Sequence, residues 1–314
     1  MVNRVDIRGF PHAYHLTEAT SAPFVLVFLH GWLLSHAYWK PVVRRLSADY
    51  QCLYYDLRGF GASQPIGDYA VRDYATAAIA DGSNVDAARP ISAPSADDPY
   101  AHTPAAYAQD LHHLLDALKI RNAWLVGHSL GGSIALWAAD QAPDRINGVI
   151  CVNSGGGIYL KEEFERFRSA GANLVKFRPR WLTQLPLLDW PLTRMNVTQP
   201  LDRRWGRQRL VDLVAAHPAA ALGALLDSTT EEEVHCLPQV VARLQQPAYF
   251  LAGEQDTVME PQYVNHLASF HPSFECGGYN VKTIPDCGHL AMVEHPDTVA
   301  HHIRDILAQH PSGK

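Results

Sequence analysis

The residues Gly127-His128-Ser129-Leu130-Gly131 constrain the fold of this chain more than any other short stretch. The pattern Gly-x-Ser-x-Gly is typical of a tight turn between a strand and a helix, with the serine hydroxyl exposed at its tip. An apolar run over 123–126 precedes the motif, and a helix-compatible run over 133–139 follows it. This context predicts a strand, a turn and a helix, with Ser129 as a nucleophile on the turn.

Apolar runs alternate with helical patterns along much of the chain. The runs lack polar alternation, which is typical of strands buried on both faces of a sheet. Strands of this kind, separated by helices, predict an α/β fold with a largely parallel sheet covered on both sides. The expected strands are 25–30, 50–56, 123–126, 146–152, 248–252 and 279–284, and the expected helices include 104–118, 261–270 and 296–310.

Two segments interrupt this alternation. Residues 64–103 are rich in Ala, Asp, Ser and Pro and predict a long surface excursion. Residues 155–244 carry helical patterns without a convincing strand, so we expect a helical cap inserted between two strands. The core would then comprise 1–154 and 245–314. Three tryptophans of the insertion are expected to pack mainly within it, namely Trp181, Trp190 and Trp205.

Composition excludes several classes of function. The formal net charge of −6 gives no electrostatic support for binding nucleic acid. No apolar run reaches the roughly 18 residues of a transmembrane helix, so stable membrane insertion is not expected. The first residues are charged where a signal peptide would be apolar, which predicts a cytoplasmic location. The five scattered cysteines favour neither a disulfide framework nor a metal site, and the oligomeric state cannot be read.

A serine hydroxyl needs a base, and the base is best oriented by a carboxylate. The acid candidate is Asp256, which follows a predicted strand and the turn residue Gly253, with Glu254 as a competitor in the same loop. The base candidate is His289, which follows the last predicted strand. His295 is interpreted as the entry to a helix that begins at the proline after it.

The end of the first apolar run, His30-Gly31-Trp32, is the fourth element of the predicted site. Two backbone N–H groups aimed at a carbonyl oxygen stabilise the negative charge that develops there during acyl transfer. We assign this oxyanion hole to the N–H groups of Trp32 and Leu130. His30 is interpreted as a structural residue beneath the loop. The side chains of Trp32, His128 and Leu290 are expected to contact substrate.

Together these motifs resemble the α/β-hydrolase superfamily, in its serine-nucleophile, lid-containing branch of esterases and lipases. The resemblance covers about residues 24–307. It implies a mostly parallel sheet of eight strands with a helical lid after the sixth, which 155–244 matches in position. It also implies that Ser129 is the nucleophile, His289 the general base and acid, and Asp256 the orienting carboxylate. The motif at 56–63 matches a structural turn of the family, and the 64–103 excursion is longer than in most relatives.

This resemblance implies a serine hydrolase that needs neither metal nor organic cofactor. Serine at position 129 disfavours haloalkane dehalogenases and epoxide hydrolases, which use Asp there. Our leading hypothesis is hydrolysis of a small-molecule carboxylic ester, with a fairly apolar substrate because the insertion is rich in Leu and Trp. One alternative is carbon–carbon bond hydrolysis or a lyase reaction, for which Arg166, Arg168 or Arg194 would supply positive charge. Another is a slow, receptor-like hydrolase, which near-single-turnover behaviour would reveal.

Overall fold

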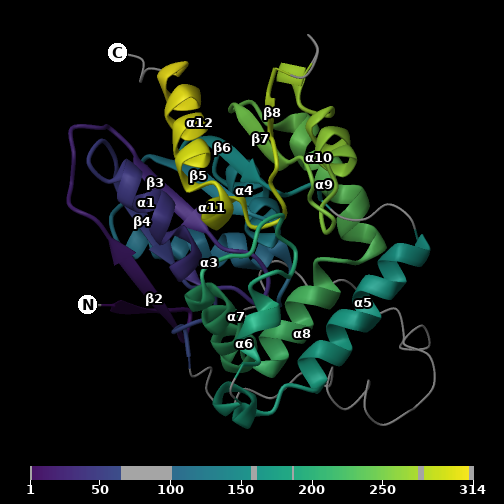
Figure 1. Ribbon diagram of the computed structural model, residues 1–314. Coiled ribbons are helices and arrows are strands. Elements are labelled where there is room, and N and C mark those ends of the chain that lie inside the picture. Colours follow the sequence, from purple (N-terminus) through teal and green to yellow (C-terminus); the bar gives the residue numbers. More distant parts are fainter. Residues whose placement is uncertain (1, 65–100, 157–160, 186, 275–278, 311–314) are drawn as a thin grey trace.

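The computed structural model describes residues 2–64, 101–156, 161–185, 187–274 and 279–310 (Figure 1). Most of the excursion predicted over 64–103 therefore lies outside the described residues. The described strands form one sheet in the order β1-β2-β4-β3-β5-β6-β7-β8. Both pairs that involve β2 are antiparallel, whereas the pairs from β4 through β8 are parallel. The predicted fold class is confirmed.

The strand bounds agree closely with the apolar runs of the sequence. The parallel strands are β3 (Val25–Leu29), β4 (Gln51–Tyr55), β5 (Ala123–His128), β6 (Ile146–Val152), β7 (Ala248–Gly253) and β8 (Val281–Ile284). The hairpin of β1 (Asn3–Ile7) and β2 (Phe10–Leu16) was not predicted. Its two-residue turn has positive φ at both Arg8 (57°) and Gly9 (85°), the geometry that matches strand twist in tight hairpins.

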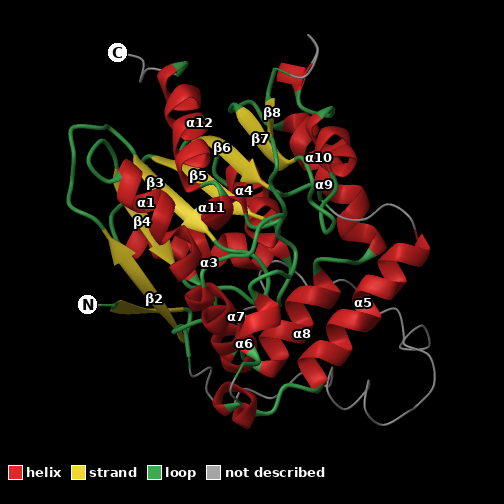
Figure 2. Ribbon diagram, viewed as in Figure 1, coloured by secondary structure: helices red, strands yellow, loops and turns green. Residues whose placement is uncertain are grey.

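Helices cover both faces of the sheet (Figure 2). Along β3, the side chains of Val25, Val27 and Leu29 join one buried cluster and those of Leu26 and Phe28 join the other. The first cluster includes α3 (Pro104–Ala117), α4 (Leu130–Gln141), α9 (Glu231–Arg243) and α10 (Pro261–Ala268). The second includes η1 (His36–Trp39), α1 (Lys40–Leu46), α11 (Ala291–Glu294) and α12 (Pro296–Ala308).

The described chain between β6 and β7 consists of helices and connecting loops, without a strand. It contains α5 (Lys161–Lys176), η3 (Arg180–Gln184), α6 (Asp189–Leu192), α7 (Arg203–Ala215), α8 (Pro218–Asp227) and α9. Figure 1 shows α5 to α8 gathered at one end of the molecule. The last helix, α9, packs on α4, and its Leu237, Val240 and Val241 belong to the cluster beneath the sheet. The insertion therefore returns to the core before β7 begins.

Two of the three tryptophans of the insertion differ from expectation. Trp205 is buried, but Trp181 and Trp190 are 55% and 58% exposed. Both lie in short helical turns, η3 and α6, which are too small to enclose a large ring on all sides.

No single described helix is long and apolar enough to cross a membrane, and α7 and α8 reach that length only as a pair bent by 95°.

Candidate active site

Ser129 occupies the turn between β5 and α4 in a strained backbone conformation. Its φ of 51° and ψ of −121° are rare for a residue with a side chain. Glycines make this turn possible. A Cβ on Gly127 would lie 2.2 Å from the carbonyl oxygen of Gly131, and a Cβ on Gly131 would lie 2.5 Å from that of Leu29. The predicted strand, turn and helix are therefore present, and the turn is packed against the end of β3.

Asp256 and His289 lie in the loops after β7 and β8 and are hydrogen bonded. The Nδ1 of His289 is 2.8 Å from Oδ2 of Asp256, and both side chains are buried. The backbone N–H groups of Val258 and Met259 donate to the other carboxylate oxygen. Burial alone would raise the pKa of Asp256, but the neighbouring His289 and the hydrogen-bond donors outweigh it and hold the pKa below its usual value. The carboxylate is thus ionised and His289 presents Nε2 away from it.

The residue before Ser129 contacts the loop of His289. The Nε2 of His128 lies 2.7 Å from the carbonyl oxygen of His289, and their rings are 4.8 Å apart. Burial, together with a smaller effect of the nearby His289, lowers the pKa of His128 to about 3. His128 is therefore neutral and donates from Nε2 to that carbonyl. This bond holds the turn of Ser129 and the loop of His289 together.

The loop of His289 is also tied to the insertion. The carboxylate of Glu294 accepts hydrogen bonds from the backbone N–H groups of Gly288, Leu290 and Thr198. The N–H of His289 itself donates to the carbonyl of Asn196, 2.9 Å away. Residues 196–198 precede α7, so the position of the imidazole depends on both the core and the insertion.

The loop His30-Gly31-Trp32 lies against the turn of Ser129. A Cβ on Gly31 would be 3.1 Å from Cβ of Ser129. The ring of His30 is fully buried, accepts from the N–H of Leu57 and donates to the carbonyl of Gly31. Burial lowers the pKa of His30 to about 4, consistent with this neutral form. His30 thus supports the loop. Leu130 begins α4, where backbone N–H groups have no intrahelical acceptor.

Other acidic and basic candidates are engaged elsewhere. The exposed carboxylate of Glu254 accepts a hydrogen bond from the N–H of Asp286. The Nε2 of His295 contacts the carbonyl oxygen of Asp286. Asp56 accepts from the N–H and ring of His36 and from the N–H of Ala62. These bonds define the turn after β4. Among the described residues, no group of three or more His, Cys, Asp or Glu side chains is arranged to hold a metal ion.

The side chains predicted to contact substrate occupy different environments. Trp32 is half-buried, and its indole N–H donates to the carbonyl of Ala221 in α8. His128 and Leu290 are buried, the latter in the cluster with α11 and α12. Their contact with substrate stays a prediction.

Two residues of the site were missed from the sequence. Asn153 follows β6, and its amide donates to Oδ2 of Asp256 and to the carbonyl of Gly288. Its position directly after an apolar strand, at the edge where the other loops meet, was the available signal. Glu294 lies five residues beyond His289 in a short helix, and nothing in the sequence singles it out.

Comparison with known proteins agrees with this architecture. The family model for the alpha/beta hydrolase fold matches residues 25–296. The 2-succinyl-6-hydroxy-2,4-cyclohexadiene-1-carboxylate synthase of Salmonella paratyphi B is 27% identical over 94% of this chain and 98% of its own. Among solved structures, an esterase from Thermogutta terrifontis has a TM-score of 0.69 at 22% identity, covering 98% of both chains. A putative lipase from Acinetobacter baumannii has a TM-score of 0.73 at 17% identity, covering 98% of this chain and 91% of that one. The chain belongs to the α/β-hydrolase fold family.

Proposed function

We propose that this protein hydrolyses carboxylic esters with Ser129 as nucleophile. The observation that carries the proposal is the buried hydrogen bond between Asp256 and His289. The loop of His289 is in turn hydrogen bonded to His128, the residue before Ser129 on its strained turn. A serine hydroxyl becomes reactive only beside a base whose tautomer is set by an acceptor on the far side of the ring. The ionised Asp256 provides that acceptor.

In the proposed reaction, Oγ of Ser129 attacks the ester carbonyl while its proton passes to Nε2 of His289. The tetrahedral intermediate collapses, and His289 gives the proton to the leaving alcohol. A water molecule, deprotonated by the same nitrogen, then cleaves the acyl-enzyme and regenerates Ser129. Asp256 holds Nδ1–H and stabilises the imidazolium that forms in each half of the cycle.

The N–H groups of Trp32 and Leu130 are the proposed oxyanion donors. The close approach of Gly31 to Ser129 supports the assignment of the first donor, and the position of Leu130 at the start of α4 supports that of the second. Each such donor stabilises the transition state by roughly 3–4 kcal/mol. The positive end of the α4 dipole acts in the same direction.

The surroundings of Trp32 support a fairly apolar substrate. Its ring lies 6.4 Å from that of Phe167 in α5. A Cβ on Gly171 would be 2.7 Å from a methyl carbon of Leu225 and 3.1 Å from the ring of Trp32. The side chains of the insertion beside the ring of Trp32 are therefore apolar, which favours an apolar acyl or alcohol group.

Hydrolysis of p-nitrophenyl esters from acetate to palmitate tests the proposal. We expect turnover that depends on chain length and is abolished by Ser129→Ala, with both proteins folded by circular dichroism. Preference for acetate would contradict the apolar substrate while leaving ester hydrolysis intact. A folded wild-type protein that cleaves none of these esters would contradict the proposal.

A second candidate is the reaction of the named Salmonella relative, because that similarity extends over nearly the full length of both chains. The product named there is a carboxylate, so its pocket must accept negative charge. Two of the arginines considered for this positive charge have other surroundings. Arg168 donates to the carbonyl oxygens of Leu226 and Thr229, and Arg194 lies on the outer surface beside Trp190. Rescue of a bacterial strain that lacks this synthase, by wild type and not by Ser129→Ala, would favour the second candidate.

A further inference from the structure

Exposed apolar side chains are concentrated on the insertion. Eight of the eleven large apolar side chains that stay exposed in the described part of the chain lie between positions 174 and 211. We name this region the 174–211 surface. Its exposed apolar members are Leu174, Phe177, Trp181, Leu185, Leu187, Trp190, Met195 and Val211. The segments η3 and α6, which carry Trp181 and Trp190, both pack on α7. Large apolar side chains exposed in this number on one part of a protein are typical of surfaces that meet another apolar phase or a partner.

Residues 174–211 carry a net positive charge, whereas the whole chain has a net negative charge. Residues 174–211 contain eight Lys and Arg against two Asp, a formal charge of +6, whereas the whole chain carries −6. Lys176, Arg180 and Arg194 have no carboxylate within ion-pair distance among the described residues. These cations are therefore available to an anionic partner.

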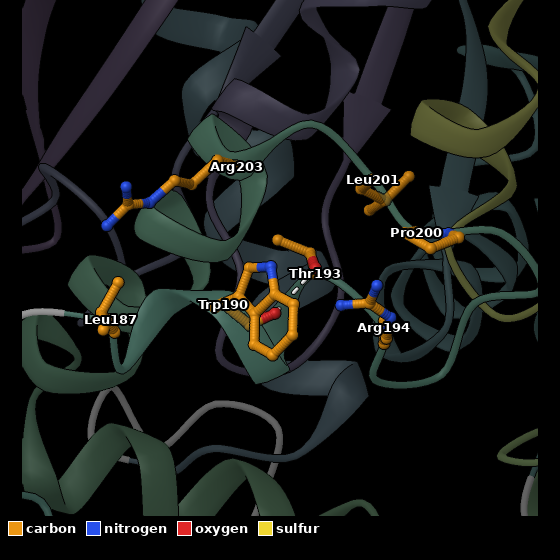
Figure 3. Close-up of a pocket in the computed structure, with 7 residues that line it drawn as sticks. All are labelled: Leu187, Trp190, Thr193, Arg194, Pro200, Leu201 and Arg203. Atoms are coloured by element: carbon orange, nitrogen blue, oxygen red, sulfur yellow. Dashed lines mark hydrogen bonds between the residues drawn. The ribbon is translucent and has the colours of Figure 1, made fainter.

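Cations and aromatic rings are paired on this surface. The guanidinium of Arg194 lies 4.7 Å from the ring centre of Trp190, and the ammonium of Lys176 lies 5.5 Å from that of Phe177. Figure 3 shows Trp190 and Arg194 in a hollow that Leu187 and Leu201 also line. The hollow has a volume of about 560 Å³. An apolar ring beside a charged group matches the boundary between hydrocarbon and water.

Polar contacts hold this surface in shape. The side chain of Arg178 donates to the carbonyl oxygens of Val175, Leu213 and Ala216. Arg203 makes two hydrogen bonds to Asp189, which is itself buried. The exposed rings between these anchors are thus presented by a preformed scaffold.

We propose that the 174–211 surface docks on an anionic lipid–water interface. Lipid headgroups would face the unpaired cations, while the rings of Trp181 and Trp190 and the neighbouring aliphatic side chains enter the boundary with the acyl chains. A second copy of the chain would bring +6 against +6, which disfavours self-association through this surface. A soluble polyanion would meet the cations but offer no apolar phase to the rings.

Sedimentation of the full chain with vesicles tests this proposal. We expect binding to vesicles of equal parts phosphatidylglycerol and phosphatidylcholine, and much weaker binding to phosphatidylcholine alone. Lys176→Gln/Arg180→Gln/Arg194→Gln should weaken binding to the anionic vesicles by roughly 100-fold. The matched control, Arg44→Gln/Lys119→Gln/Arg121→Gln, removes three exposed cations elsewhere and should change binding far less.

Tryptophan fluorescence gives an independent measurement of binding to the same vesicles. Fluorescence should shift to shorter wavelength and be quenched by brominated lipid on binding, and Trp181→Ser/Trp190→Ser should lose most of both signals. Equal binding of the control and test triples, binding to heparin but not to vesicles, or a dimer formed through the surface would each overturn the proposal. Binding needs no turnover, so the result is independent of the proposed ester hydrolysis.

Discussion

The Nδ2 of Asn153 lies 2.8 Å from Oδ2 of Asp256, the same oxygen that receives the Nδ1–H of His289. Asn153 adopts a φ of 49° directly after β6, and its amide also contacts the carbonyl of Gly288, 3.2 Å away. One buried amide therefore connects the ends of β6, β7 and β8. It donates to the carboxylate of Asp256 and fixes this group relative to the imidazole.

Replacing Asn153 with Ala should lower kcat with little change in KM. A hydrogen bond to a charged group contributes about 1.5–3 kcal/mol, which corresponds to roughly a 10–100-fold loss. Asn147→Ala, at an exposed position of the same strand, is the matched control and should leave kcat unchanged. Equal kinetics for the two variants would show that the amide has no positioning role.

Asp256→Asn should preserve the fold and lower kcat by roughly 10⁴-fold, because an amide no longer sets the tautomer of His289. Steady-state kinetics at neutral pH, with circular dichroism to confirm folding, measure this effect. Glu254→Gln, at the exposed acid two residues earlier, is the control. If Glu254→Gln were the more damaging change, the assignment of Asp256 would be wrong.

The titration of the buried Glu233 should make the stability of the protein depend on pH. Its carboxyl is buried, accepts from the indole N–H of Trp137, and has its pKa raised by burial to about 7. Because the unfolded value is near 4.3, the folded protein binds more protons between about pH 4 and 7, and stability falls as pH rises through this range.

Glu233→Gln removes this titration but keeps an acceptor for Trp137. The stability of this variant relative to wild type should therefore increase from pH 5 to pH 8, by up to about 3 kcal/mol. Chemical denaturation at both pH values measures the difference. Glu231→Gln, exposed on the same helix, should show no such trend. A pH-independent difference for Glu233→Gln would refute the account of this buried acid.

Gly131→Ala should destabilise the protein and impair catalysis together. The new methyl group would lie 2.5 Å and 2.7 Å from the carbonyl oxygens of Leu29 and His30, so α4 or the loop at residues 30–32 must move. Overpacking of this kind costs about 1–3 kcal/mol. Ser133→Ala in the same helix is the control for thermal unfolding and kcat. Unchanged behaviour of Gly131→Ala would contradict the close packing of the two loops.

The sequence predicted those features that depend on local pattern. The apolar runs marked six strands, and the order of Ser129, Asp256 and His289 pointed to loops that the structure places after β5, β7 and β8. The β1–β2 hairpin was missed because its strands are short and its turn residues, Arg8 and Gly9, form a weak signal. Asn153 and Glu294 act through contacts with residues distant in sequence, which periodicity cannot reveal.

The exposure of Trp181 and Trp190 was also unpredictable from pattern, because it depends on how short helices pack on α7 rather than on their own sequence. Aromatic residues are usually taken as core, and two of the three here lie on the surface. This difference is one of the observations behind the proposal that the 174–211 surface docks on lipid.

The most direct test of the central claim is labelling by an alkyl fluorophosphonate, followed by mass spectrometry of the intact protein and its peptides. This probe forms a covalent bond with a serine only where a base and an oxyanion hole activate it. We predict one adduct per chain, located on Ser129, absent in Ser129→Ala and formed far more slowly in Asp256→Asn. A folded protein that takes no label, or takes it at another residue, would contradict the activation of Ser129 by His289 and Asp256.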